Sequence, residues 1–595
     1  MTEQELAGLI WDVKETIRDT YDDTEVENVI LPFTLLRRMD CILQPVRSTI
    51  EQELAKYDEP QRSTVLKTLI RKYGLQFYNT SGFTLSGLLA KPAAIGANFK
   101  LYLEGYTDNI KDILNNYTHE DAENGDLTKI YSRLLRENLL FQVTQQFANI
   151  DLSPKAVDNA KMGTIFEIII RRAKESTNTK AGQFYTPRDI VRTLASLVLC
   201  GKEQEIQTPY RHFSIYDPCC GTGGMLTEAK KLIEEKAKEA GRTDVKVMLN
   251  GQELNEKTYA ICKADMLLTG ELQSGDIEVG DTLASDKFVG KTFNYMLANP
   301  PFGVDWKKIE KTITAEYDSK KGRFNAGLPS TTDGSLLFLQ HMISKMDKDF
   351  GSRIGIVLNG SPLFNGDAGS GWSNIRKSLL EDDILDAIIA IPKNLFYSTD
   401  ISTYLWILDN KKPESHKGKI LFINASDQDT FSELLKKNLG KKRYSISDKA
   451  TTGIVELYRN FTNAELTIGK ETVTVARLMD IEDFLYTKVT VERPLLDENK
   501  KPILKKGMPQ PDGNLRDTER IPFKTDIDTY FKNEVIRFAP DAWMDRTKDK
   551  IGCEFPFTKL FYRYKSPRAT DVIFNDLKQL DKDIEKEISN LKNAE

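Results

Sequence analysis

The stretch Phe293-Asn294-Tyr295-Met296-Leu297-Ala298-Asn299-Pro300-Pro301-Phe302 gives the clearest indication of how the chain folds. Its first six residues form a mostly apolar run, and two adjacent prolines follow one residue later. Proline cannot donate a backbone hydrogen bond to a neighbouring strand, and it restricts the backbone angle φ. The stretch therefore predicts a buried strand over residues 293–298 that ends abruptly at the proline pair.

Three chemically useful groups stand at the predicted end of this strand. They are the amide of Asn299, the carbonyl of Pro300 and the ring of Phe302. The amide oxygen and a rigidly held carbonyl can accept hydrogen bonds from an amino group, and the ring can stack on its heterocycle. We regard Asn299, Pro300, Pro301 and Phe302 as candidate catalytic residues acting on a planar amine, such as that of a nucleobase. The alternative is a strand that ends in a Pro-Pro turn with a core phenylalanine.

The sequence around this strand alternates between strand-like and helix-like segments from residue 213 onward. Short apolar runs predict strands at residues 213–216, 245–249, 277–279, 293–298, 354–358, 384–390 and 403–408. Amphipathic segments such as 225–240 and 257–268 lie between them. This alternation is typical of an α/β fold with a parallel sheet, in which ligands bind at the carboxyl ends of the strands.

Polar residues or glycines follow each of the first four predicted strands. The turn after the first strand contains the candidate ligand-binding residues Asp217, Pro218, Gly221, Gly223 and Gly224. Glycines let the backbone pass close to a bound ligand. Glu253, after the second strand, can accept hydrogen bonds from ribose hydroxyls. Asp281, after the third strand, can bind an amino group. We therefore predict one ligand site at this edge of the sheet.

The glycine turn does not match the common nucleotide-binding motifs. The dinucleotide-binding pattern needs a third glycine where Leu226 stands. The nearest P-loop-like string, residues 285–292, lacks its first glycine and leads into a strand, so we expect no ATPase activity. Cys219 and Cys220 could suggest a thiolate nucleophile. Their position inside the ligand turn favours a role in packing or in shaping the backbone.

A second candidate ligand-binding segment precedes the alternating region. A polar loop, residues 176–182, leads into Gln183, Phe184, Tyr185, Thr186 and Pro187. Thr186 is predicted to cap a helix over residues 188–199, with Pro187 in its first turn. The free N–H groups of a helix N-terminus attract an anion such as a carboxylate, so this segment adds an anion-binding group to the site.

Three further features each allow two interpretations. A basic stretch after Phe302 could contact phosphates or form a solvated loop; it comprises Lys307, Lys308, Lys311, Lys320, Lys321 and Arg323. Phe396 could offer a second ring face to a base or belong to the core. Arg37 and Arg38 could contact a phosphate or a partner, or could end a helix in solvent.

The chain is long enough for several domains. Apolar residues at helical spacing predict a helical N-terminal domain at residues 1–155, followed by an α/β domain at 156–480. Residues 481–595 form a C-terminal region with an exposed loop or hairpin at 496–520. Its last helix, residues 569–593, has an apolar stripe made of Ile573, Leu577, Leu580, Ile584, Ile588 and Leu591. The near-heptad spacing of this stripe favours docking on a partner, although the body of the chain could also cover it.

Composition excludes several classes of protein. The chain is 40% hydrophobic and 29% charged, and its apolar runs are too short to span a bilayer. Six cysteines without CxxC spacing indicate reduced thiols, and the N-terminus shows no secretion signal, so we expect a cytoplasmic protein with no membrane contact. Four widely spaced histidines make a metal site or a histidine-based triad improbable.

The order and spacing of these motifs resemble the methylation subunit of type I restriction–modification systems. Members of that family are DNA adenine-N6 methyltransferases that use S-adenosylmethionine. The resemblance covers nearly the whole chain, and it rests on Phe166-Glu167, Gly182 to Pro187, Asp217 to Gly224, Glu253, Gly280 to Leu283, Asn299 to Phe302, Phe396, Pro540 to Trp543 and Glu554 to Phe557. It implies a Rossmann-like class I methyltransferase domain between a helical N-terminal domain and a C-terminal helical tail.

The resemblance also implies a role for each candidate residue. The segment from Gln183 to Pro187 would line the methionine end of S-adenosylmethionine, and the glycine turn after Asp217 would hold its backbone nearby. Glu253 would bind the ribose and Asp281 the adenine amino group. The target adenine would be flipped out of the duplex. It would then stack on Phe302 and Phe396, and it would present its N6 amine to Asn299 and Pro300 for direct methyl transfer.

If the substrate is DNA, the net charge of −5 indicates that another chain supplies many of the DNA contacts. The resemblance implies a separate DNA-specificity (S) subunit, a second methylation subunit and a restriction/translocase (R) subunit as partners. Alternative interpretations remain: a self-sufficient DNA methyltransferase, an enzyme that methylates a protein glutamine or an RNA amine, or a subunit that only assembles a complex.

Overall fold

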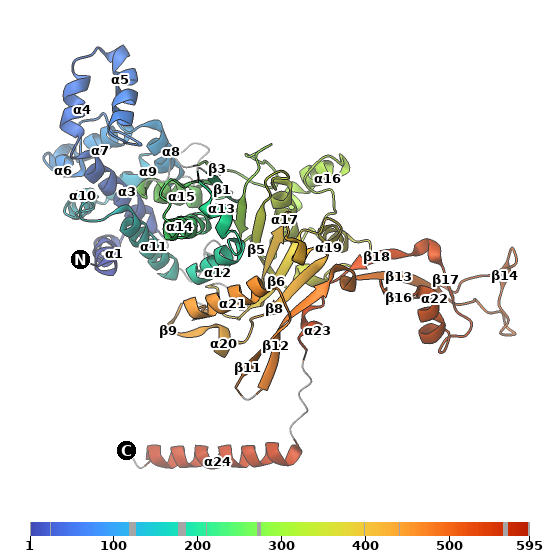
Figure 1. Ribbon diagram of the computed structural model, residues 1–595. Helices are drawn as coiled ribbons and strands as arrows, with labels where there is room; N and C mark the ends of the chain where they lie inside the picture. Colours follow the sequence, from blue (N-terminus) through green and yellow to red (C-terminus); the bar gives the residue numbers. More distant parts are fainter. Residues whose placement is uncertain are drawn as a thin grey trace. The chain divides into compact units, whose positions relative to one another are not determined.

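A mixed β-sheet forms the framework of the protein, as the computed structural model shows (Figure 1). The structure describes residues 2–23, 25–117, 127–176, 186–209, 211–269, 275–397, 399–439, 441–469, 471–562 and 569–592. Two compact units are present, residues 1–555 and residues 556–595. The main sheet belongs to the first unit, and its described strands run in the order β11-β12-β8-β6-β7-β5-β4-β1-β2-β3.

The strands of the main sheet lie close to the predicted positions where predictions were made. Their bounds are β1 (His212–Asp217), β2 (Lys246–Glu253), β3 (Ile277–Val279), β4 (Tyr295–Ala298), β5 (Arg353–Asn359), β6 (Leu385–Ile391), β7 (Thr403–Asp409), β8 (Lys419–Asn424), β11 (Ala464–Ile468) and β12 (Glu471–Asp480). The last three strands were not predicted. The strand predicted from residue 293 is reduced at its start to an isolated bridge between Phe293 and Met346, and the continuous strand begins at Tyr295.

The predicted parallel sheet is present in one half of the main sheet, and the sheet as a whole is mixed. Strands β1 to β5 pair in parallel, and so do β6 and β8. Strand β7 is antiparallel to both β5 and β6, and β12 is antiparallel to β8. Only residues 392–402 join β6 to β7, whereas a parallel crossover usually needs about a dozen residues or more with a helix. The parallel half is the half whose strand ends line the candidate site.

Helices cover both faces of the sheet (Figure 1). The helices that accompany it are α12 (Arg188–Val198), α13 (Glu203–Gln207), α14 (Gly224–Glu239), α15 (Glu256–Leu268), α16 (Glu310–Asp318), α17 (Ser335–Ser344), α18 (Ser361–Phe364), α19 (Gly371–Glu381), α20 (Gln428–Phe431) and α21 (Asp448–Asn460). On one face α12 packs against α14 and α21, and its Leu194 and Val198 share a core with Ile215 and Leu297 of the sheet. Burial of this apolar face fixes α12 over the strands that form the site.

The N-terminal region is helical, as predicted. Its helices are α1 (Glu3–Trp11), α2 (Val13–Ile17), α3 (Glu27–Leu43), α4 (Arg47–Leu54), α5 (Glu59–Lys72), α6 (Leu85–Leu88), α7 (Ile95–Glu104), α8 (Asp108–Asn116), α9 (Lys129–Arg136), α10 (Leu140–Ala148) and α11 (Asn159–Ser176). Phe33 lies at the centre of their core, with ring centroids 5.5 Å from Phe99 and 5.4 Å from Phe147. Helix α15 joins this core to the sheet, because Ala260 and Leu267 are buried in it.

Arg38 has neither of the two roles considered for it, and Arg37 is partly buried. The Arg38 side chain is fully buried and donates hydrogen bonds to the carbonyls of Leu152 (2.6 Å) and Val157 (2.7 Å). Arg37 donates to the carbonyl of Ile150 at 2.6 Å. Both arginines therefore hold the chain that leads from α10 to α11, and Arg38 is not available to a phosphate.

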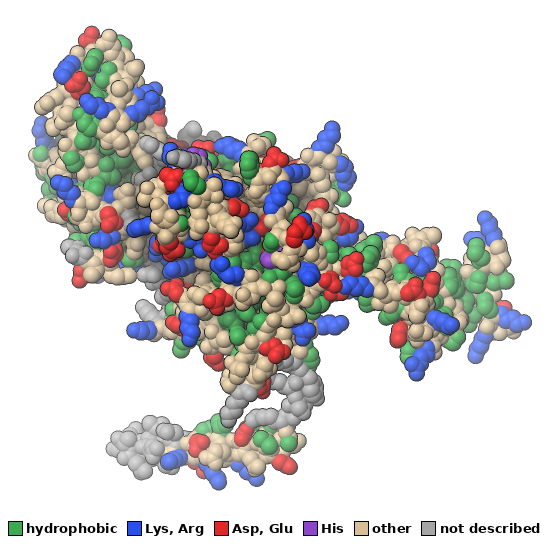
Figure 2. Space-filling view, in the orientation of Figure 1, with side chains coloured by type: hydrophobic (Ala, Val, Ile, Leu, Met, Phe, Trp, Pro, Cys, Tyr) green, Lys and Arg blue, Asp and Glu red, His purple; other side chains and the backbone are tan. Residues whose placement is uncertain are grey.

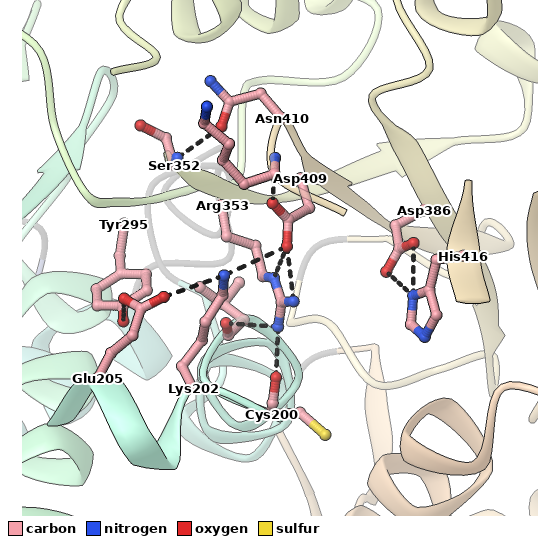
Figure 3. Close-up of polar contacts among 12 residues, drawn as sticks. Cys200, Lys202, Glu205, Tyr295, Ser352, Arg353, Asp386, Asp409, Asn410 and His416 are labelled. Atoms are coloured by element: carbon pink, nitrogen blue, oxygen red, sulfur yellow. Dashed lines mark hydrogen bonds and ion pairs between the residues drawn. The ribbon is translucent and has the colours of Figure 1, made fainter. Parts of the chain in front are cut away.

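A buried ion pair fastens α12 to the edge of the sheet opposite the carboxyl ends of the parallel strands (Figure 3). Arg353 and Asp409 face each other on β5 and β7, and the guanidinium donates to the Asp409 carboxylate at 2.7 and 3.1 Å. The same guanidinium donates to the carbonyls of Val198 (3.2 Å) and Cys200 at the end of α12. Burial alone would raise the pKa of Asp409, but Arg353 and Lys202 lower it, so the carboxylate stays charged.

The region after residue 484 contains a second, antiparallel sheet that was not predicted. It consists of β13 (Leu485–Glu492), β16 (Asp517–Pro522), β17 (Trp543–Met544) and β18 (Lys550–Cys553). The predicted exposed hairpin is present as β14 (Leu504–Lys505) and β15 (Met508–Pro509). Smaller elements are β9 (Glu433–Leu439), β10 (Lys442–Ser445) and α22 (Ile527–Tyr530).

The second unit contains α23 (Phe557–Leu560) and α24 (Thr570–Lys592). Within this unit no described residue covers the apolar stripe of α24, and Leu577 and Leu580 are 55% and 59% exposed. The side chains of Ile588 and Leu591 lie outside the described part. Across the described part of the chain, no helix combines the length and the apolar character that a membrane span requires.

Candidate active site

One cavity of about 350 Å³ lies at the carboxyl ends of the parallel strands. It brings together most of the predicted site residues, namely Thr186, Asp217, Pro218, Gly221, Gly224, Glu253, Asp281, Asn299 and Pro301. Pro187, Gly223, Pro300, Phe302 and Phe396 are not part of its lining. Gln183, Phe184 and Tyr185 lie outside the described residues.

The glycine turn after β1 is held by the acidic residue at the end of β2. The Glu253 carboxylate accepts hydrogen bonds from the backbone N–H groups of Gly221 (2.9 Å) and Asn255 (2.9 Å). Gly223 has φ +84°, and a Cβ atom there would lie 2.8 Å from the Cys262 sulfur, so only glycine fits. A carboxylate has further lone pairs, and Glu253 can therefore still accept hydrogen bonds from a ligand in the cavity.

Asp217 and Glu253 are buried carboxyl groups with raised pKa values. Burial, aided by the nearby Glu253 charge, raises the pKa of Asp217 to about 7. Burial likewise raises the pKa of Glu253. Asp217 accepts a hydrogen bond of 3.0 Å from the Cys219 N–H, which shapes the turn. Two buried acidic groups side by side favour a ligand that brings positive charge or hydrogen-bond donors.

Asp281 organises the loop after β3. Its Oδ1 atom accepts hydrogen bonds from the N–H groups of Leu283 (2.9 Å) and Ala284 (3.2 Å). The hydroxyl of Thr282 donates to the Pro218 carbonyl at 2.5 Å, which ties this loop to the glycine turn. The loops after β1 and β3 are thereby held together on the same side of the cavity.

Asn299 carries the most unusual feature of the site. Its amide nitrogen donates a hydrogen bond of 2.9 Å to the Thr186 hydroxyl. Its amide oxygen is buried and accepts no hydrogen bond from any residue that the structure describes. A buried polar atom without a partner costs roughly 1–3 kcal/mol. This cost is explained if a ligand with an N–H donor completes the site.

Thr186 does not cap α12, contrary to prediction. The helix starts at Arg188, its N-cap position is Pro187, and no side chain caps it. The Thr186 hydroxyl is instead the partner of Asn299. The start of α12 is fixed from another direction, because Lys442 donates to the Asp189 carboxylate at 2.9 and 3.0 Å.

The two candidate aromatic residues lie side by side. The ring centroids of Phe302 and Phe396 are 6.1 Å apart, and the ring planes meet at 82°. Phe302 is half-buried, whereas Phe396 is 4% exposed and belongs to the core under the sheet. Phe302 is therefore the more accessible ring, and a stacking role for Phe396 stays a prediction.

Several residues that line the cavity were not predicted. They are Gly163, Thr164, Ile170, Arg188, Val191, Cys219, Cys220, Thr222, Met225, Thr227, Glu228, Lys231, Leu254, Asp265, Thr269, Thr282 and Phe338. Thr222 and Leu254 adjoin predicted residues and could have been found from the strand ends. Phe338 and the residues of α11 carry no local signal, because only packing brings their helices to the cavity.

The cysteines of the turn do not have the character of nucleophiles. Burial raises the pKa of the Cys219 thiol well above its ordinary value. A hydrogen bond with the Cys262 thiol, together with burial, has the same effect on Cys220. Both groups are therefore protonated at neutral pH, which favours the packing role. In the part of the chain that the structure describes, no cluster of His, Cys, Asp or Glu is arranged to hold a metal ion.

The fold and the site define the class of protein. A Rossmann-like sheet places a glycine turn, acidic residues at strand ends and two residues of the Asn-Pro-Pro-Phe stretch, Asn299 and Pro301, around one cavity. The N-6 DNA Methylase family matches residues 157–498, and the HsdM N-terminal domain matches residues 6–147. The chain belongs to the N-6 DNA methylase family.

Individual relatives agree with this assignment. The type I restriction enzyme MjaIX methylase subunit of Methanocaldococcus jannaschii is 24% identical, over 78% of this chain and 78% of its own length. The MjaVIII methylase subunit of the same organism is 30% identical over 52% of this chain and 48% of its own length. The predicted resemblance and the predicted methyltransferase function are confirmed.

A solved structure shows the same fold. The type I restriction–modification system methyltransferase subunit from Streptococcus thermophilus aligns with a TM-score of 0.61 and 22% identity. The alignment covers 80% of this chain and 96% of that chain. The predicted Rossmann-like α/β class, with a helical N-terminal region, is thus confirmed.

Proposed function

We propose that this chain transfers a methyl group from S-adenosylmethionine to N6 of an adenine flipped out of double-stranded DNA, as the adenine-specific methylation subunit of a type I complex. The observation that carries the proposal is the buried Asn299 amide oxygen, which lacks a donor among the described residues. An adenine N6 amine supplies that donor. The family assignment supports DNA as the substrate.

The residues around the cavity fit S-adenosylmethionine. Glu253 and Asp281 offer acceptors for ribose hydroxyls and for an adenine amino group, and both line the cavity. The buried carboxyl groups of Asp217 and Glu253 suit a ligand with positive charges. The segment 183–187 would hold the methionine end, with Thr186 at the cavity wall. When bound, the cofactor supplies a methyl group on a positively charged sulfur.

Asn299 and Pro300 would orient the target amine. The Asn299 oxygen and the Pro300 carbonyl each accept one N6 hydrogen, which directs the nitrogen lone pair away from the ring and toward the methyl donor. Phe302 stacks on the base and offsets part of the cost of flipping, at about 1–3 kcal/mol for such a contact. Phe396 would contribute a second face or support the edge of Phe302. Positioning and electrostatics supply the catalysis, and the proton leaves N6 after attack.

Substitution of Asn299 tests the proposal directly. Asn299→Ala should abolish DNA methylation while the full-length chain still binds S-adenosylmethionine in a calorimeter. Asn294→Ala is the matched control, because Asn294 stands on the same stretch and accepts a hydrogen bond from Ser214 N at 2.9 Å, outside the cavity lining. Full activity of the Asn299 variant would refute the assignment.

A side-by-side transfer assay distinguishes the substrate classes. Tritiated S-adenosylmethionine is offered with unmethylated DNA, RNA and protein to the assembled complex. Incorporation into DNA as N6-methyladenine is expected. Incorporation into RNA alone or protein alone would show that this molecule, and not DNA, is the substrate.

The proposed partners are DNA, a DNA-specificity (S) subunit, a second methylation subunit and a restriction/translocase (R) subunit. The apolar stripe of α24 supports docking on another chain, since Ile573, Leu577, Leu580 and Ile584 are exposed within its unit. Figure 2 shows hydrophobic side chains among charged ones on this helix. The net charge of −5 supports a separate source of DNA contacts. We place the complex in the cytoplasm, where its six free cysteines would stay reduced.

A further inference from the structure

Residues 304–334 form a long inserted segment that follows the Asn-Pro-Pro-Phe stretch almost directly. We call this segment the excursion. It leaves and rejoins the fold at one place, because Gly334 N donates to the Val304 carbonyl (3.1 Å) and Trp306 N donates to the Thr331 carbonyl (3.0 Å). The excursion contains α16 (Figure 1). It connects the candidate catalytic stretch to α17.

The excursion has its own small core, and the loop after β3 contributes to it. Leu283, two residues after Asp281, is 4% exposed and packs with Trp306, Ile313 and Phe324 of the excursion. The loop that carries Asp281 is thus bound to the excursion by apolar contact. This contact holds one side of the loop but does not fix the direction of its backbone.

Arg323 fixes the direction of the loop backbone. Its guanidinium donates to the carbonyls of two successive loop residues, Thr282 at 2.8 Å and Leu283 at 2.7 Å. The opposite side of the guanidinium is held by Glu316 on α16, through contacts of 2.9 and 2.7 Å. Burial alone would raise the pKa of Glu316, but the hydrogen bonds from Arg323 lower it, so the pair stays charged. Arg323 therefore does not serve as the phosphate contact considered from the sequence.

A further contact ties Arg323 to the strand that precedes the glycine turn. Arg323 Nη1 lies 3.0 Å from His341 Nδ1, and His341 Nε2 lies 2.9 Å from the Tyr216 hydroxyl. A guanidinium can only donate, so Nδ1 accepts and the imidazole proton is on Nε2, facing Tyr216. Burial and the Arg323 charge lower the pKa of His341 to about 3, which agrees with a neutral ring. Tyr216 directly precedes Asp217 in β1.

We propose that Arg323 is a positioning residue that sets the loop Gly280–Leu283, and with it Asp281, for the adenine end of S-adenosylmethionine. The inference rests on the proposed function, which supplies the ligand. Asp281 accepts hydrogen bonds from the N–H groups of Leu283 and Ala284, so a shift of the backbone at Thr282 and Leu283 moves its carboxylate. The planar guanidinium group can donate to two carbonyls and a carboxylate at once, and the ammonium group of a lysine cannot replace it.

The test compares Arg323→Lys with the wild-type full-length chain. The Kd for S-adenosylmethionine, measured by calorimetry, should rise about tenfold, as expected for lost hydrogen bonds to a charged group. In the assembled complex the KM for S-adenosylmethionine should rise equally. The kcat at saturating cofactor and the KM for DNA should stay within about twofold. An unchanged Kd, or a fall in kcat without a change in Kd, would overturn the proposal.

Two variants separate positioning from general loss of stability. Arg353→Lys is the matched control, because Arg353 also holds two backbone carbonyls and one carboxylate, at the other edge of the sheet. It should lower the Tm without changing the Kd for the cofactor. An equal rise in Kd in this variant would contradict a specific role for Arg323.

Glu316→Gln is the second variant, and it keeps one of the two acceptor oxygens while removing the charge. It should raise the Kd by less than Arg323→Lys does, and an unchanged Kd would count against the proposal even if Arg323→Lys failed to fold. The wild-type chain reports on the proposed function separately. If wild type binds cofactor and methylates DNA while the Arg323 and Glu316 variants match it, only the role of Arg323 fails.

Discussion

The side-chain amide of Asn299 and the hydroxyl of Thr186 form a hydrogen bond of 2.9 Å between the end of β4 and the residue before Pro187. The bond uses the amide nitrogen and thereby fixes which atom of Asn299 is left for a ligand, namely its oxygen. The orientation of the candidate catalytic amide is thus set by a segment that precedes it by more than a hundred residues. Thr186 and Asn299 line the same cavity.

Removal of the Thr186 hydroxyl should slow the reaction. In Thr186→Val the Asn299 amide loses its partner and samples other orientations, so kcat should fall about tenfold, in line with one lost neutral hydrogen bond. Thr186→Ser keeps the hydroxyl and should retain kcat within about threefold. Steady-state methylation with saturating cofactor measures both. Equal activity of the valine and serine variants would show that the hydrogen bond does not orient Asn299.

The stability of the ligand-free chain should depend on pH through Asp217. Burial raises the folded-state pKa to about 7, compared with about 3.9 for an unfolded aspartate. The folded state therefore binds the proton more tightly. The stability that this group contributes is fully present below about pH 4 and is lost as pH rises toward 7. At about 1.4 kcal/mol per pKa unit, the loss is on the order of 4 kcal/mol.

Asp217→Asn isolates this contribution, because it removes the titrating group and keeps an acceptor oxygen for the Cys219 N–H. Urea unfolding of the wild-type chain and the variant at pH 4.5, 6 and 7.5 gives the difference in free energy of unfolding. The variant should gain stability relative to wild type as pH rises. A difference that is constant across these pH values would contradict a raised pKa for Asp217.

Removal of only one partner of the Arg353–Asp409 ion pair should lower the free energy of unfolding strongly. Both side chains are at most 5% exposed, and Arg353→Met leaves a buried carboxylate whose remaining cation among the described residues is Lys202. A loss of about 3–5 kcal/mol is expected by urea unfolding. The double variant Arg353→Met, Asp409→Leu should lose less than the single variant, since it buries no unpaired charge. A larger loss in the double variant would refute this account.

The sequence predicted which strand ends meet at the cavity better than it predicted the strand directions in the sheet. Asp217, Glu253, Asp281 and Asn299 each follow an apolar run, and parallel pairing brings their strand ends to one edge, so periodicity and position were enough. The contact between Arg323 and the loop after β3 was not predictable. It joins residues about forty positions apart, and its partners include two backbone carbonyls that leave no trace in the sequence.

The unpredicted parts of the fold also have physical reasons. Strand β7 is antiparallel to its neighbours, and the short link after Ile391 was a signal for this that the apolar pattern alone did not show. Asp386 interrupts an apolar run, yet it is buried within β6. Its carboxylate has polar partners there, because the Tyr458 hydroxyl donates to Oδ2 at 2.5 Å and His416 Nδ1 lies 3.0 Å from Oδ1. Both partners come from distant segments, so the sequence around Asp386 could not reveal them.

Helix α24 should be needed for assembly and not for cofactor binding. Removal of residues 569–595 deletes the apolar stripe, and the truncated chain should fail to co-purify with the specificity subunit while its Kd for S-adenosylmethionine is unchanged. Leu577→Gln with Leu580→Gln should weaken assembly in the same way, because the two side chains are 55% and 59% exposed in their unit and available for burial. Lys578→Ala with Lys582→Ala is the matched control on the same helix and should assemble normally. A truncated chain that still forms the full complex would show that α24 is not the docking element.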